Sequence, residues 1–149
     1  MKKYVLFMLL LLSFTFMLSA CSQSEEEKTQ VYLENNALTF YHFLVVDFTD
    51  GELNIEVQMF DTSDTWSNKN PEFDVAVETK ILLEAVKKYS KEHEDILKEV
   101  KLYFVSESNR TVAEINANND TLLENNWSEL DADEIPQTVD GYKFYGFSN

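Results

Sequence analysis

The dipeptide Asp50-Gly51 lies between two β-forming runs, TFYHFLVVDFT and ELNIEVQMFD, and it constrains the fold more than any other feature of the sequence. Asp-Gly is typical of the two-residue type I′ turn, in which both central residues have positive φ. After the turn, apolar and polar residues alternate, which indicates a strand with one buried face. The sequence therefore predicts a β-hairpin whose core-side pairs are Phe48–Leu53, Val46–Ile55 and Leu44–Val57.

The segment that follows predicts one long helix. Asn70 is a favourable N-cap, Pro71 suits the first helical position, and apolar residues recur at helical spacing to about Tyr89. The next stretch, SKEHEDILKE, either extends this helix or begins a second short one. Alternation then predicts a third strand in VKLYFVSE and a weaker fourth in RTVAEIN, while GYKFYGF is a strand or a docked aromatic tail. The predicted fold is α+β, an antiparallel sheet of about four strands (β-β-α-β-β) with one main helix on one face and an aromatic C-terminal tail.

The first residues have the composition of an export signal. Lys2 and Lys3 give a positive start, and an uncharged run from Tyr4 to Ser24 follows. The apolar part of this run, 4–18, is at the short end for a membrane-spanning helix, which needs about 20 residues. A positive start, an apolar middle and small residues at the end indicate a secretory signal.

The end of this segment, Leu18-Ser19-Ala20-Cys21, resembles the lipobox of bacterial lipoproteins. The resemblance implies a type II signal peptide, attachment of a diacylglycerol to Cys21 through a thioether, and removal of residues 1–20. It covers only the first 21 residues, and no family is recognised for the domain that follows. An ordinary cleaved signal and an uncleaved signal anchor are the alternatives, and both also export the chain.

The expected organisation is therefore a signal peptide over 1–20, a lipidated Cys21 with a flexible acidic tether over 21–30, and a single domain over 31–149. The tether is predicted from SQSEEEKTQ, which is polar and has no apolar period. The expected location is the outer face of the cell membrane, and the composition favours a Gram-positive host.

Charge limits the partners. The chain has a net charge of −15, and removal of Lys2 and Lys3 with the signal would bring it to −17. Arg110 is the only arginine, so the chain lacks the cations that neutralise a nucleic-acid backbone. The acidic field instead favours a basic peptide, a basic protein surface or a divalent metal.

Two loops are candidate sites for a cation. The first has oxygen-bearing side chains at alternate positions after the hairpin, but Trp66 and Lys69 stand where an EF-hand loop needs a glycine and an oxygen ligand. Its candidate metal ligands, for Ca²⁺ if any, are Asp61, Ser63, Asp64 and Glu72. The second is the acidic stretch ENNWSELDADE, which is a cation site, a docking patch for a basic partner, or a solvated loop. Its candidate residues are Glu129, Asp131, Asp133 and Glu134.

The outer face of the hairpin is more apolar than a solvated face requires. Its candidate partner-binding residues are Tyr41, Phe43 and Phe60, which share that face with Val45. Either the aromatic C-terminal tail covers this face, or the face is an exposed partner site.

No catalytic motif occurs in the sequence. His42 is expected on the core face opposite Met59 and His93 near the helix end, so they are not expected to share a site. The preferred interpretation is a non-enzymatic, membrane-anchored lipoprotein whose acidic domain binds a protein or peptide, without a cofactor. The alternative is an acidic metal- or solute-binding lipoprotein, and a cell-wall hydrolase is the least favoured.

Overall fold

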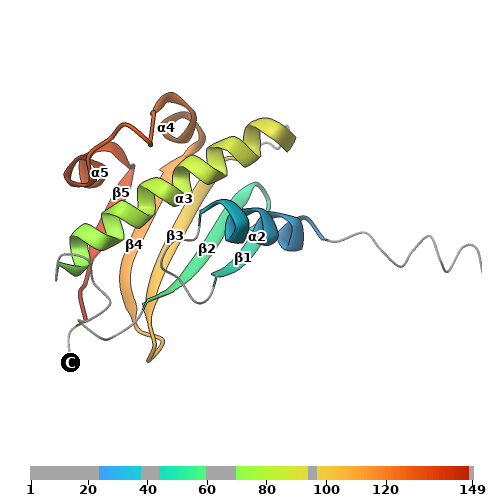
Figure 1. Ribbon diagram of the computed structural model, residues 1–149. Helices are drawn as coiled ribbons and strands as arrows, with labels where there is room; N and C mark the ends of the chain where they lie inside the picture. The colour runs from blue at the N-terminus through green and yellow to red at the C-terminus, as the bar shows by residue number, and fades with distance from the viewer. Residues whose placement is uncertain (1–23, 38–43, 60–69, 94–96, 148–149) are drawn as a thin grey trace, which may run out of the picture.

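The computed structural model describes residues 24–37, 44–59, 70–93 and 97–147. Five strands form one sheet in the order β1-β2-β3-β4-β5, with the long helix α3 across one face, α2 beside it over β1, and the short C-terminal helices on its other flank (Figure 1). The elements are α2 (Glu25–Asn36), β1 (Leu44–Thr49), β2 (Glu52–Met59), α3 (Pro71–His93), β3 (Glu99–Ser106), β4 (Thr111–Asn118), α4 (Asn119–Glu124), η2 (Ala132–Glu134), α5 (Ile135–Thr138) and β5 (Gly141–Phe144).

The predicted hairpin is confirmed. Asp50 and Gly51 have φ angles of 54° and 87°, as a type I′ turn requires, and β1 pairs with β2 in the predicted register. Along β2 the apolar residues are buried and face the helices, while the residues between them face the other side of the sheet.

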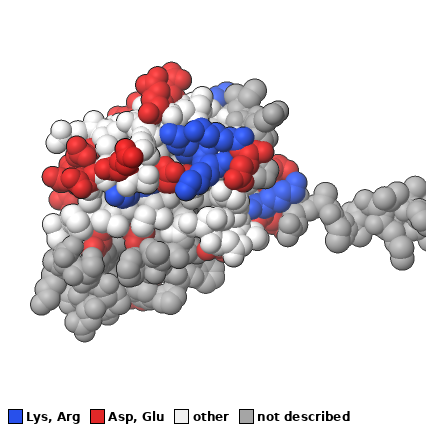
Figure 2. All heavy atoms as spheres, turned by 45° about the horizontal axis from the view of Figure 1, so that its top comes forward, with Lys and Arg blue, Asp and Glu red and all other residues white. Residues whose placement is uncertain are grey.

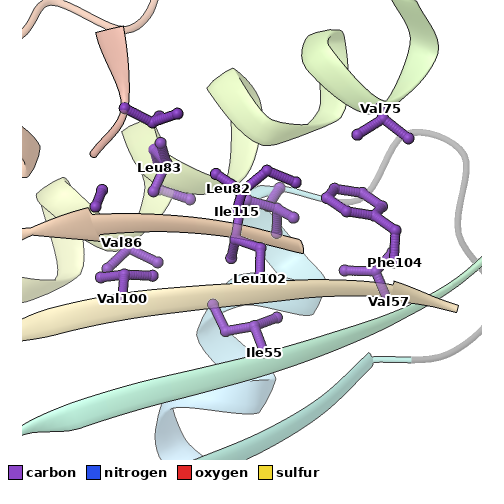
Figure 3. Close-up of a cluster of buried hydrophobic side chains, with 14 of the residues drawn as sticks. Ile55, Val57, Val75, Leu82, Leu83, Val86, Val100, Leu102, Phe104 and Ile115 are labelled. Atoms are coloured by element: carbon purple, nitrogen blue, oxygen red, sulfur yellow. The ribbon is translucent and has the colours of Figure 1, made fainter. Parts of the chain in front are cut away.

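The long helix begins where the sequence predicted. The backbone N–H of Phe73 donates to Asn70 Oδ1 at 3.4 Å, and Pro71 is the first helical residue. The helix extends to His93, beyond the predicted end near Tyr89. Its buried stripe packs on the sheet, as Figure 3 shows for side chains of α3 above those of β2, β3 and β4. The contacting residues include Val75, Leu82, Leu83, Val86, Ile55, Val57, Val100, Leu102, Phe104 and Ile115.

The prediction of an α+β fold with about four strands and one main helix is confirmed in outline, whereas the prediction that the sheet is antiparallel is wrong. Strand β3 runs parallel to β2, because α3 is long enough to return the chain to the end of the sheet where β2 begins. At that end the backbone N–H of Lys98 donates to the carbonyl of Gly51 at 2.8 Å. The aromatic tail also contributes a fifth strand, β5, which pairs antiparallel with β4. The sheet is therefore mixed.

The predicted flexible tether also differs from the structure, because residues from Glu25 onward form α2. Ser24 is the N-cap, since its Oγ accepts from Glu27 N at 3.2 Å, and the glutamates at 25–27 complement the positive end of the helix. Thr29 and Leu33 are buried against the rest of the fold. Only the short segment before Ser24 remains as a candidate spacer after Cys21.

A polar network crosses the sheet face that carries no helix. Lys101 Nζ lies 2.8 Å from Glu52 Oε2 and 3.2 Å from Glu99 Oε2, and Asn116 Nδ2 donates to Glu99 Oε1 at 3.0 Å. The bond from Asn116, with a further contribution from Lys101, lowers the pKa of Glu99. These contacts link β2, β3 and β4, so they favour the observed register more than they add stability.

Gly141 is the position where this network leaves no room for a side chain. A Cβ at residue 141 would lie 1.9 Å from Asn116 Oδ1. Gly141→Ala is therefore expected to destabilise the fold by about 1–3 kcal/mol, as overpacking does. In an Asn116→Ala background the same change is expected to have a much smaller effect, because the obstructing atom is gone. Urea unfolding of the four proteins of this cycle measures the difference, and equal losses in both backgrounds would contradict the steric explanation.

Candidate partner-binding surfaces

The segment from Glu124 to Glu134 forms a rigid shelf beside α3, which we call the acidic ledge. In the structure this stretch runs from the end of α4 through η2 to the start of α5. Trp127 is fully buried, and its Nε1 donates to the carbonyl of Leu122 at 2.9 Å. The ledge is thus fixed from below by an aromatic side chain.

Two lysines of α3 hold the ledge from the side. Lys80 Nζ donates to the carbonyl of Leu130 at 2.6 Å, and Lys87 Nζ donates to the carbonyl of Asn125 at 2.5 Å. These lysines are seven residues apart, so they project from the same side of the helix. Because both bind backbone carbonyls, they position the ledge without occupying its carboxylates.

The predicted acidic residues of the ledge are all exposed. Figure 2 shows acidic side chains at the margin where α4, η2 and α5 lie, and lysines over the middle of the face along α3. In the part of the chain that the structure describes, salt bridges join Lys28 to Glu25, Lys88 to Glu84, and Lys101 to both Glu52 and Glu99. None of them includes a ledge carboxylate. The exposed set is Glu124, Glu129, Asp131, Asp133 and Glu134.

Two ledge carboxylates have a local structural role, because Asp131 is the N-cap of η2 and forms a capping box with Glu134. The backbone N–H of Asp131 donates to Glu134 Oε2 at 2.9 Å, and the N–H of Glu134 returns to the carbonyl of Asp131 at 3.1 Å. This reciprocal arrangement closes the start of η2. Glu129 and Asp133 lie outside this cap, and Asp131→Asn keeps a side-chain oxygen at the N-cap, so neutralising these three residues disturbs the fold least.

The carboxylates of the ledge do not converge on one point. Within the described ranges, no three side chains of His, Cys, Asp or Glu lie close enough together to hold a metal ion. Of the residues predicted as ligands in the first loop, Asp61, Ser63 and Asp64 lie outside the described residues. Glu72 is exposed in the first turn of α3, and its carbonyl accepts from Tyr142 Oη at 3.3 Å.

The apolar face predicted on the hairpin is described only at Val45, because Tyr41, Phe43 and Phe60 lie outside the described residues, as does His42. Val45 is 51% exposed. At Val45 the aromatic tail does not cover this face, because β5 pairs with β4 at the edge of the sheet opposite β1. Beyond β5, Tyr145 N donates to the carbonyl of Val112 at 2.8 Å, so the tail stays beside β4.

The edge of β1 and the neighbouring helix α2 were not predicted from the sequence, because residues 21–30 were predicted to form a flexible tether. The signal for α2 was the N-cap pattern of Ser24 before three glutamates, which fits a helix start. Gln30 of α2 donates through Nε2 to the carbonyl of Leu44 at 2.9 Å, so the helix and the edge strand form a joint surface.

No helix within the described residues is both long enough and apolar enough to span a bilayer. The chain matches no protein-family model, no characterised protein and no solved structure at a significant level. The function of this chain is therefore inferred from the acidic ledge and the other surfaces described above.

Proposed function

We propose that this chain is a lipoprotein anchored through Cys21 at the outer face of the cell membrane, and that its acidic domain binds a basic protein or peptide partner without catalysing a reaction. The lipobox pattern of residues 18–21 supports the anchor. The exposed, rigidly held carboxylates of the acidic ledge support the partner class, because an acidic surface attracts and orients a basic one.

The observation that carries this proposal is the way in which the ledge is built. Trp127 and two lysine-to-carbonyl bonds fix its backbone, while its carboxylates extend to solvent without a salt-bridge partner among the described residues. A solvated loop needs no such support. A fixed array of charges binds with a smaller loss of conformational entropy than a mobile one.

The start of α2 bears on how the domain would be held. Ser24, the N-cap of α2, is three residues after Cys21, and three extended residues span at most about 10 Å. With a lipid on Cys21, the domain would remain next to the bilayer surface. A partner that this domain binds would therefore itself lie at the membrane or in the adjacent wall.

A zero-length carbodiimide crosslinker tests the proposal, because it joins carboxylates only to amines in direct contact. Intact cells that express the full chain would be treated and their crosslinked products quantified. Glu129→Gln/Asp131→Asn/Asp133→Asn is expected to reduce a lysine-containing crosslinked partner at least about tenfold, since charge-assisted contacts at the site would be lost. High salt is expected to weaken the same complex.

The matched control is Glu72→Gln/Glu92→Gln/Glu107→Gln, which removes the same charge from exposed residues away from the ledge. This variant is expected to retain the crosslinked partner. A partner that survives neutralisation of the ledge, or that is lost equally in the control, would rule out the ledge as the binding surface.

A further inference from the structure

Strand β1 is an edge strand of the sheet, so half of its backbone groups face away from β2. In a two-residue hairpin the pair that flanks the turn, Thr49–Glu52, is hydrogen-bonded, and bonded and non-bonded pairs then alternate. Phe48, Val46 and Leu44 belong to the non-bonded pairs. Their N–H and C=O groups therefore point outward from the sheet.

Among the described residues, only the first part of this edge is covered by a neighbour. The carbonyl of Leu44 accepts from Gln30 Nε2 at 2.9 Å, and the same amide nitrogen donates to Glu34 Oε1 at 3.0 Å. In the part of the chain that the structure describes, no group bonds to the outward amides of Val46 and Phe48. These two residues offer two donors and two acceptors at the spacing that an added strand requires.

The surroundings of this open edge are acidic on both sides. Glu27, Val31 and Glu34 lie on the same side of α2 as Gln30, because they are three or four residues from it or from one another. All three are exposed, Val31 at 46%. On the face of the sheet that carries no helix, the side chain of Asp47 lies between the two open residues and is exposed.

A second copy of this chain is a poor occupant of the edge. In the antiparallel register that uses both Val46 and Phe48, Asp47 of one copy would face Asp47 of the other at a close, non-hydrogen-bonded position. Each copy also has a net charge of −15. Like charges directly opposite each other destabilise a strand pair, so the edge disfavours self-association.

We propose that the edge of β1 at Val46–Phe48 binds an extended, basic segment of a partner protein by β-strand addition. The segment would form backbone hydrogen bonds with Val46 and Phe48. Basic side chains of the segment would lie beside Asp47 on one face, and its apolar side chains would lie beside Val31 of α2 on the other, with Glu27 and Glu34 adding to the acidic field. This surface is separate from the acidic ledge, which lies on the opposite flank of α3, so it goes beyond the function proposed above.

The probe is a fluorescent heptapeptide that alternates lysine and valine, titrated into the full chain extracted in a non-ionic detergent. Binding by anisotropy is expected to coincide with slower hydrogen–deuterium exchange in residues 44–49. A peptide N-methylated at every backbone nitrogen keeps its charges but has no backbone N–H donor. It is expected to bind at least about tenfold more weakly, because the backbone hydrogen bonds to the edge are lost.

Charge reversal at the edge supplies a second, independent measurement. Asp47→Lys is expected to weaken the lysine–valine peptide about tenfold and to strengthen a glutamate–valine peptide, since the sign of the central charge changes. Lysine is a residue that natural edge strands carry, so the variant is expected to fold. Asp131→Lys on the acidic ledge reports separately on any peptide bound there. Glu107→Lys, at an exposed residue of the turn between β3 and β4, is the matched control and is expected to leave both affinities unchanged.

The outcomes separate this inference from the function proposed for the acidic ledge. Equal binding of the N-methylated peptide, or no protection of residues 44–49, would overturn the edge proposal. So would a peptide that responds to Asp131→Lys and not to Asp47→Lys, although that result would still agree with the ledge as a basic-partner site. A peptide bound at the edge in a chain whose ledge captures no partner would support the edge and contradict the ledge.

Discussion

Replacing Trp127 with alanine is expected to lower the free energy of unfolding by about 3–5 kcal/mol, as removal of a large buried aromatic side chain does. The side chain is fully buried, and its Nε1 bonds to the carbonyl of Leu122, so the change leaves both a cavity and an unsatisfied carbonyl. This loss is a large share of the 5–15 kcal/mol that is typical of a domain. Exchange of residues 119–138 with deuterated solvent is expected to accelerate, because the ledge loses its support.

Two further substitutions define the reason for this loss. Trp127→Phe keeps most of the ring and removes the donor, so it is expected to lie between the wild type and Trp127→Ala. Leu123→Ala is the control, since Leu123 is the neighbour of the bonded Leu122 and is 36% exposed. Urea unfolding followed by circular dichroism measures all three. A loss for Trp127→Ala no larger than that for Leu123→Ala would show that Trp127 does not anchor the ledge.

The second large effect is expected at Cys21. In cells supplied with a fatty-acid analogue, the wild-type chain is expected to take up the label, and Cys21→Ala is expected to take up none. The proposed lipobox would place the modified thiol at this residue, the only cysteine of the chain. Two or more acyl chains hold a protein stably at a membrane, so Cys21→Ala is also expected to lose this lipid-mediated attachment to the membrane.

Ser22→Ala changes the residue beside the cysteine and keeps the thiol, so it is expected to retain the label. Mass spectrometry of the purified wild-type chain supplies the opposing outcome. A chain recovered with its first twenty residues intact and an unmodified Cys21 would contradict the proposed anchor.

The hairpin and the main helix could be predicted because their signals are local. Asp50-Gly51 sets the turn, the turn sets the register, and alternation along β2 then identifies the buried face. Asn70 and Pro71 likewise mark the start of α3 within two residues. In each case neighbours in sequence determine the geometry, so no knowledge of distant contacts was needed.

The direction of β3 could not be predicted in this way. Whether a strand that follows a helix runs parallel or antiparallel depends on how far the helix carries the chain across the sheet. The extension of α3 to His93 decides this, and the sequence around Tyr89 left that extension open. The C-terminal strand β5 was equally ambiguous, because four aromatic-rich residues fit an edge strand or a docked tail.

Helix α2 was not predicted because it has little apolar periodicity. Among its residues only Thr29 and Leu33 are buried. Its packing depends on contacts with β1 and α3 that lie far away in sequence, such as the edge-to-face contact of Tyr32 with Tyr89 at 5.1 Å. A capped start with three glutamates was the available signal, and composition alone reads the same residues as solvated.

The acidic residues of the ledge were identified from composition, but their arrangement was not. Trp127 lies beneath them, and Lys80 and Lys87 bind the backbone beside them. The two lysine contacts span 50 and 38 residues of sequence, respectively, so local patterns do not reveal them. The open edge of β1 was not predicted at all, because it exists only once α2 has been placed beside it.

The order of strands in the sheet is the same as their order along the chain, and this bears on how the molecule assembles. No later strand has to insert between two earlier ones, so a chain that is delivered across the membrane N-terminus first can add each strand to the one before it. The pairing of β3 with β2 is expected to be the slowest of these steps, because it closes the longest segment between consecutive strands and depends on α3. Substitutions that weaken this parallel pair, such as Ile55→Val, should therefore slow refolding more than equally destabilising changes in β5.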